Sequence, residues 1–515
     1  MSKRISKKTL GLIVWGALAL SAIGAWWMNQ PRLPAKWEEV QRLPNIFPDY
    51  CNTVIPPNIA PLNFKVNEVG NDYRVRIYGE NGEEILLSSR RGKIIIPPKP
   101  WRELLLKNRG GQIQLEVYVK SEKGGWQHFE PVENAVAQEN IDSHLAYRLL
   151  GSVCNMYNRI GIYQRNLETY EETPVVVNER GGCINCHSFS NNDPNLFSFH
   201  VRPGSASAGE NIPAAMIGVR DGRAEQFKTT GAPGYISWRA DGKAVAFALG
   251  MPRQIFRSHG PEIRDVFDCK SDLAIADTST GQASASPEIQ KADHLETFPC
   301  WSADGKTLYY CTAPTQWSDE IPMDSDGIKN TMFDLMRIAY DIESDTWGEP
   351  EVVLASADVG KSLIEPRTSP DGKYLLFCMS DYGGFPINQE SCDLYMMELS
   401  SGAYRRLECN SDKTDSWHSW SNNSRWIVFS SKRDNGLFAR PYICYIDEEG
   451  REHKPFPLPQ KDPDFYDTFL RTYNLPELVS GPITLSQEEL LDAYIPPEMV
   501  DDSSVPWRQE STSYQ

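Results

Sequence analysis

The sequence predicts an all-β fold in which repeated four-stranded sheets form a β-propeller of five or six blades. The main observation is a repeated string in which an aromatic or polar residue is followed by an Asp-Gly-Lys turn and an alternating apolar strand. Three copies begin at Ser237, Trp301 and Thr368. Asp-Gly is typical of a tight β-hairpin because glycine accepts a positive φ at no steric cost. Two further copies, at Ser188 and Ser419, carry Asn pairs in the turn.

A second strand pair follows each of the last four copies, so each unit contains two hairpins and forms a four-stranded sheet. The first strands of these pairs are Asp272 to Ala276, Asp334 to Ala339, Asp393 to Leu399 and Tyr442 to Ile446. Long, regularly spaced units of this kind favour a radial array of blades, with a stacked solenoid as the alternative. A sixth blade could come from residues 455–480 or from the chain before Cys183.

The N-terminus predicts a signal anchor over residues 1–30, with a short cytoplasmic tip. Lys3, Arg4, Lys7 and Lys8 precede an uncharged apolar run from Leu10 to Met28. A run of this length can cross a hydrocarbon core of about 30 Å, and the positive charges keep the short side in the cytoplasm. A cleaved signal peptide is the alternative. In either case we expect the bulk of the chain in the periplasm, anchored to the inner membrane if the run is retained.

Composition bounds the possible partners and the number of domains. The 515 residues are too many for one ordinary core, so we expect at least two domains. The net charge of -17 argues against nucleic acid, because phosphate binding needs a basic surface. Eleven cysteines are an ordinary number for this length and do not indicate a disulfide scaffold.

The remaining chain divides by pattern. Residues 31–135 alternate as strands and predict a small β-sandwich. Residues 136–186 predict a connector, with a helical stretch from Ile141 to Leu150 and a segment rich in Tyr and Arg. The propeller is expected over residues 187–480, and residues 481–515 are expected to be an acidic tail, partly disordered from Asp501.

Cys183, Cys186 and His187 form a C-x-x-C-H string, which is the signature of covalent c-type haem attachment. The two thiols would form thioethers with the haem vinyl groups, and His187 would be the proximal iron ligand. The alternative is structural. Because His418-Ser419 repeats His187-Ser188 without a preceding Cys pair, both histidines could simply bond a neighbouring backbone, with Cys183 and Cys186 in a disulfide.

The repeated strings resemble the blade signature of TolB-like propellers. The stretch from Ile55, through Gly161, to the cysteine pair is similar to a group of Bacteroidetes envelope proteins labelled TolB-like or cytochrome c biogenesis-related. The resemblance implies an exported propeller that carries a haem motif followed by a Phe-His-x-Arg string, here Phe199 to Arg202. That match makes His200 a candidate distal iron ligand, with Met216 and Met156 as alternatives.

Two functions follow from these patterns. The first is a membrane-tethered cytochrome that binds haem c and passes electrons between envelope partners. The second is a TolB-like scaffold that binds a protein or glycan, with a structural cysteine pair. An enzyme is less favoured, since the sequence contains neither a G-x-S-x-G nor an H-E-x-x-H motif.

Overall fold

The computed structural model describes residues 31–151, 160–177, 182–203, 214–227, 233–256, 264–317 and 325–494. The expected signal anchor at residues 1–30 and the end of the chain from 495 lie outside these ranges. Within them, no helix is both long and apolar enough to cross a membrane.

The N-terminal domain contains two β-sheets and one helix. The larger sheet consists of β1 (Glu38–Val40), β9 (Trp126–Phe129), β8 (Gln112–Lys120), β10 (Val132–Val136), β3 (Val54–Ile55), β5 (Asp72–Gly79) and β6 (Ile85–Ser89); the smaller one consists of β2 (Ile46–Phe47), β4 (Phe64–Val66) and β7 (Lys93–Ile94). The helix α2 (Pro98–Lys107) was not expected from the sequence. Its signals are a proline in the first turn and buried Trp101, Leu104 and Leu105 on one face.

Five sheets follow one another along the chain, each a meander of antiparallel strands. Blade 1 contains β14 (Gly182–Phe189), β15 (Phe197–Pro203), β16 (Ala215–Arg220) and β17 (Arg223–Phe227); blade 2 contains β18 (Pro233–Trp238), β19 (Ala244–Phe256), β20 (Arg264–Asp277) and β21 (Ala283–Ser284); blade 3 contains β22 (His294–Trp301), β23 (Thr307–Pro314), β24 (Asp334–Asp341), β25 (Thr346–Trp347) and β26 (Glu351–Leu354); blade 4 contains β27 (Ser362–Thr368), β28 (Tyr374–Ser380), β29 (Asp393–Glu398) and β30 (Tyr404–Arg406); blade 5 contains β31 (Asp415–Trp420), β32 (Trp426–Ser431), β33 (Arg440–Tyr445) and β34 (Phe456–Pro457).

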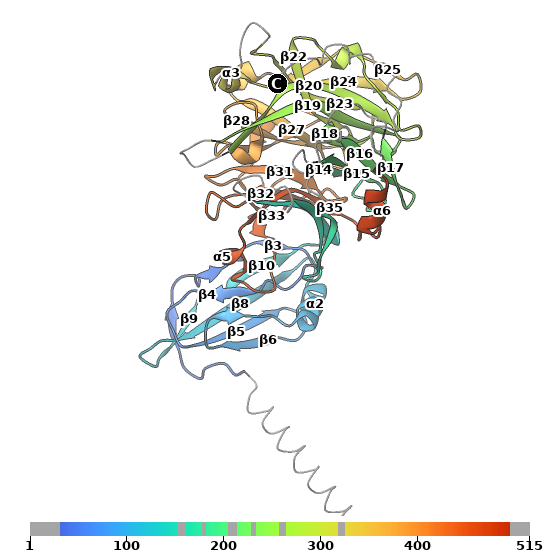
Figure 1. Cartoon of the computed structure of the whole chain (residues 1–515). Coiled ribbons are helices and arrows are strands. Elements are labelled where there is room, and N and C mark those ends of the chain that lie inside the picture. Colours follow the sequence, from blue (N-terminus) through green and yellow to red (C-terminus); the bar gives the residue numbers. More distant parts are fainter. Residues whose placement is uncertain are drawn as a thin grey trace, which may run out of the picture.

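A sixth sheet joins the two ends of the propeller. β35 (Arg471–Val479) pairs antiparallel with β11 (His144–Gly151), which is followed by β12 (Gly161–Asn166) and β13 (Glu172–Val177). The first strand of each blade contacts that of the next, and β35 contacts β14, so the inner strands form a closed ring of six. Radial closure of this kind leaves only short, protected sheet edges. The expected all-β, propeller-like fold is therefore observed (Figure 1).

The helical prediction for Ile141 to Leu150 is wrong, because His144–Gly151 is strand β11. The mostly apolar stretch from Leu145 to Leu150, interrupted by Arg148, is compatible with either element, and periodicity alone does not decide between them. Pairing decides: β11 lies between β12 and β35 and is buried on both faces, with only its two ends partly exposed. The connector expected at 136–186 therefore consists largely of blade strands.

The N-terminal domain and the propeller share one hydrophobic core. Ile55, Phe64 and Trp101 belong to the same buried cluster as Trp426 and Tyr473 of blades 5 and 6. Figure 1 shows the domain against this side of the propeller, below β33 and β35. Blades 2 to 4 lie farther along the ring.

We expect that a chain ending at residue 470 loses cooperative folding or melts on the order of 10 °C or more lower, because β11 would be left without its partner β35. A chain ending at residue 494 keeps β35 and α6 (Gln487–Asp492) and is the matched control. Thermal unfolding followed by circular dichroism checks this. Equal melting of the two chains would show that β35 does not close the ring.

Candidate functional site on the propeller axis

Each inner strand contains one non-glycine residue with a left-handed backbone. These residues are Cys186 (φ 21°), Tyr235 (48°), Phe298 (50°), Glu365 (59°), Trp417 (48°) and Leu475 (50°). In all six strands the residue lies at a break in the pairing register. Left-handed conformations are costly for side chains with a Cβ and often occur at sites with a special role. Here the bulges place six equivalent residues around one small cavity on the axis.

The axial cavity is narrow. Besides the six bulge residues, its walls include His187, Ile236, Pro299, Pro366 and Arg367. The remaining free space holds roughly one or two water molecules. The centre of the propeller is thus a packed plug with a thin opening.

A buried ionic group lies beside this plug. Arg367 approaches Glu477, with 3.7 Å between Nη2 and Oε1, and the backbone N–H of Phe189 donates to Glu477 Oε2 at 3.1 Å. Burial raises the pKa of Glu477 to about 7, and the charge of Arg367 opposes this rise. Burial also raises the pKa of Glu365 well above its usual value. Arg367 is therefore the positive centre between two buried carboxyl groups.

His187 is buried against blade 6. Its ring faces the backbone of Ala146 and Leu475 and makes an edge contact with Phe189 at 5.9 Å, but neither ring nitrogen makes a hydrogen bond of ordinary geometry. Burial, with the nearby charges of Arg148 and Arg367, lowers the pKa of His187 to about 3. The imidazole is therefore neutral at physiological pH.

His418 occupies the same position in blade 5. Its Nε2 lies 3.1 Å from the Leu376 carbonyl oxygen, and its ring also faces the backbone of Glu365. In register, Leu376 and Glu365 of blade 4 correspond to Ala146 and Leu475 of blade 6. Each histidine thus packs against the backbone of the preceding blade, but of the two only His418 makes a backbone hydrogen bond of ordinary geometry there.

His200 does not meet His187. Across β14 and β15, Asn185 pairs with His200 and His187 pairs with Phe199. Directly paired residues share a face and successive residues alternate, so His187 and His200 lie on opposite faces of the blade 1 sheet. Met216 pairs with His200 and belongs to the core with blade 2. The structure therefore does not bring His200 or Met216 to the side of His187, and Met156 lies outside the described residues.

The described residues around His187 do not fit a haem in this arrangement. Cys186 and His187 both reach the axial cavity, but that cavity is far smaller than a porphyrin. The backbone of Cys183 pairs with Arg202 in the same sheet.

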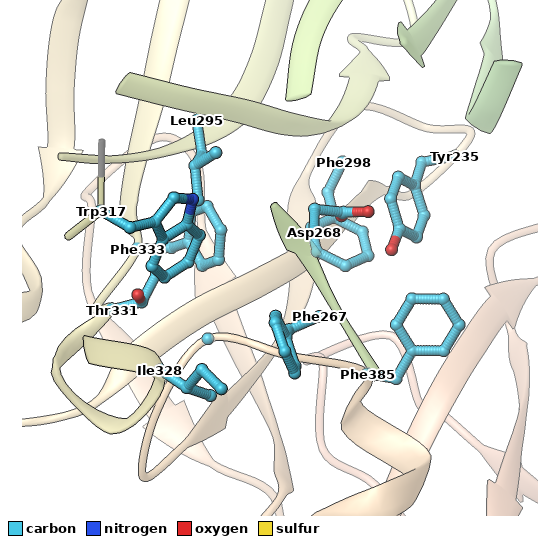
Figure 2. Close-up of a pocket in the computed structure, with 12 residues that line it drawn as sticks. Tyr235, Phe267, Asp268, Leu295, Phe298, Trp317, Ile328, Thr331, Phe333 and Phe385 are labelled. Atoms are coloured by element: carbon cyan, nitrogen blue, oxygen red, sulfur yellow. The ribbon is translucent and has the colours of Figure 1, made fainter. Parts of the chain in front are cut away.

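A second pocket, which the sequence did not predict, adjoins the axis on blades 2 to 4 (Figure 2). Aromatic side chains dominate its walls, and they include Tyr235, Phe267, Phe298, Trp317, Phe333 and Phe385. The rings of Tyr235 and Phe298 are tilted by 42° with their centroids 4.1 Å apart, and both residues line both pockets. The feature of the sequence that could have indicated this pocket is the pair of long insertions after β23 and β28.

No family model matches the chain, and no curated protein matches it. Among solved structures, it is similar to an oligogalacturonate lyase from Vibrio parahaemolyticus (12% identity, 57% of this chain and 85% of that chain, TM-score 0.30). It is also similar to a putative 6-phosphogluconolactonase from Bacteroides uniformis (13% identity, 66% and 98%, TM-score 0.34). These likenesses say nothing about the activity of this chain. Its propeller fold is identified from the order of its own strands.

We expect His187→Gln to weaken the acid sensitivity of the fold. The pKa of His187 is about 6.5 in the unfolded chain and about 3 in the folded chain. The free energy of unfolding therefore decreases as the pH falls between those values, by up to about 1.4 kcal/mol per pH unit. Denaturant unfolding from pH 7 to pH 4 measures this slope. His453→Gln, at a histidine with a 40% exposed side chain, is the control. An unchanged slope in His187→Gln would show that His187 is not held neutral.

Proposed function

We propose that this chain is a non-enzymatic binding protein, a TolB-like propeller scaffold that holds an apolar side chain of a protein partner in the aromatic pocket on blades 2 to 4. The observation that carries the proposal is the aromatic lining of this pocket, whose present free space is about that of one water molecule, so its side chains would move apart to admit the partner. The pocket is built largely from residues at or beyond strand ends, including Trp317 after β23 and Phe385 after β28. Binding residues are often found on such loops over a rigid scaffold.

The lining favours a protein partner over a glycan. Of the described side chains that line the pocket, four carry polar atoms, namely Asp268, Thr331, Tyr235 and Trp317. The Trp317 Nε1 already donates to the Cys269 carbonyl oxygen at 2.7 Å. A sugar needs many directed hydrogen bonds, whereas an aromatic or aliphatic anchor needs a pocket of this kind. Exposed apolar residues also occur on blade 2, at the end of β19 that pairs with the start of β20. There Met251 and Phe256 are more than half exposed.

The position of the pocket agrees with a scaffold role. The N-terminal domain packs on blades 5 and 6, at a different part of the ring from the pocket. If residues 10–28 anchor the chain in the inner membrane, this domain separates the propeller from the anchor. The aromatic pocket would then be offered to an envelope partner on the periplasmic side.

In vivo photo-crosslinking tests the proposal. We expect a benzoylphenylalanine in place of Trp317 to give one discrete protein adduct, and one in place of Tyr404, which is 40% exposed on the outer strand of blade 4, to give none. Phe385→Ser should abolish the adduct because it removes a pocket wall. Absence of an adduct from position 317, together with retention of the chain on immobilised glycans, would overturn the proposal in favour of glycan binding.

Covalent haem c is the second candidate, and the Cys183–Cys186–His187 string supports it. If attached, haem would supply electron transfer, with the two cysteines as anchors and His187 as the proximal ligand. We expect the full chain, matured in a host that attaches c-type haem, to show no haem stain after denaturing electrophoresis. A stained band that disappears in the Cys183→Ser/Cys186→Ser chain but persists in Cys269→Ser would make the cytochrome the better description.

A further inference from the structure

We propose that Glu365, Cys378 and His418 form a buried site for a zinc-type divalent cation in the wall between blades 4 and 5. The three residues come from β27, β28 and β31. Their potential ligand atoms all lie within 4.8 Å of one another, and all three residues are buried. Cysteine, histidine and a carboxylate are the ligand types that Zn²⁺ takes in proteins.

The spacing of the ligand atoms fits tetrahedral coordination. Cys378 Sγ lies 3.9 Å from Glu365 Oε2 and 3.7 Å from His418 Nδ1. Ligands on a tetrahedron around Zn²⁺, at about 2.0 Å for nitrogen or oxygen and about 2.3 Å for sulfur, lie on the order of 3.3 to 3.8 Å apart. Small side-chain shifts would therefore bring the three atoms into coordination distance.

The neighbouring groups orient these ligands. His418 Nε2 lies 3.1 Å from the Leu376 carbonyl oxygen and donates its proton there, which leaves Nδ1 as the nitrogen that faces Cys378. The backbone N–H of Trp417 donates to Glu365 Oε2 at 3.1 Å. Metal-binding histidines usually donate their second ring N–H to such a partner, and ligating carboxylates are usually hydrogen-bonded.

The equivalent position around His187 provides an internal comparison. There the register places Leu475 where blade 4 has Glu365, and Arg148 where blade 4 has Cys378. Neither leucine nor arginine ligates a cation in this setting. Two histidines in the same backbone environment therefore differ in their neighbours, and among the described residues only His418 is surrounded by a set of cation ligands.

The charges balance when the ion is bound. Arg367 and Glu477 form one pair of opposite charges. A Zn²⁺ ion with a Cys378 thiolate, a Glu365 carboxylate and neutral His418 forms a second neutral group. Burial is tolerable for charges that neutralise one another in this way. The site is enclosed, so the ion would enter during folding.

Metal analysis of the full chain, produced with Zn²⁺ in the medium, tests this site. We expect about one Zn²⁺ per chain, and X-ray absorption should show one sulfur ligand at about 2.3 Å with nitrogen or oxygen ligands at about 2.0 Å. Two sulfur ligands would contradict the proposed ligand set, because Glu365, Cys378 and His418 supply only one sulfur. A chain without Zn²⁺ would overturn the proposal outright, with no variant needed.

Variants locate the ion. We expect Cys378→Ser and His418→Gln to bind Zn²⁺ at least about tenfold more weakly than the unchanged chain, because each substitution removes a ligand. Cys392→Ser changes a buried thiol next to the site, and His187→Gln changes the equivalent histidine; both should keep the ion. Near-ultraviolet circular dichroism checks that each variant folds. Retention of Zn²⁺ in folded Cys378→Ser would contradict the assignment.

Discussion

The bulge in each inner strand is the constraint on which the rest of the propeller depends. A left-handed residue at the same point of every inner strand breaks the pairing register and turns one side chain toward the axis. Three of these residues are followed by proline, which has no N–H to lose from the strand ladder and is therefore tolerated at a bulge. Six residues that lie far apart in the sequence therefore determine which side chains fill the axis of the propeller.

The same constraint explains why a sequence motif and a structural position can coincide. Cys186 is the bulge residue of blade 1 and His187 follows it, as His418 follows Trp417 in blade 5. Both histidines pack on the backbone of the preceding blade. The C-x-x-C-H string therefore overlaps a position that already accepts histidine for packing, and what distinguishes the two sites chemically is the neighbouring blade.

The propeller was predictable where local chemistry determines the structure. Three Asp-Gly-Lys turns and two Asn-pair turns predicted five blades, because hairpins are encoded in short strings. The strands of the sixth blade were not identified from the sequence, only two segments that could supply them. β11 and β35 come from opposite ends of the propeller and pair through tertiary contact. The likeness of Leu475-Pro476 to Glu365-Pro366 is the signal that could have found β35. The Phe-His-x-Arg string made His200 a candidate distal ligand for an iron held by His187. The bulge at Cys186 instead puts the two histidines on opposite faces of the blade 1 sheet. The aromatic pocket and the Glu365–Cys378–His418 cluster were beyond reach, because insertions and separate blades contribute their members.

A high-resolution crystal structure of the full chain, matured in a host that attaches c-type haem, tests the role of the inner ring most directly. We expect the imidazole of His187 to face the backbone of Ala146 and Leu475, with Cys186 on the axis and no porphyrin bound to it. A porphyrin joined to Cys186 by a thioether, with His187 on its iron, would contradict the packing role assigned to this histidine.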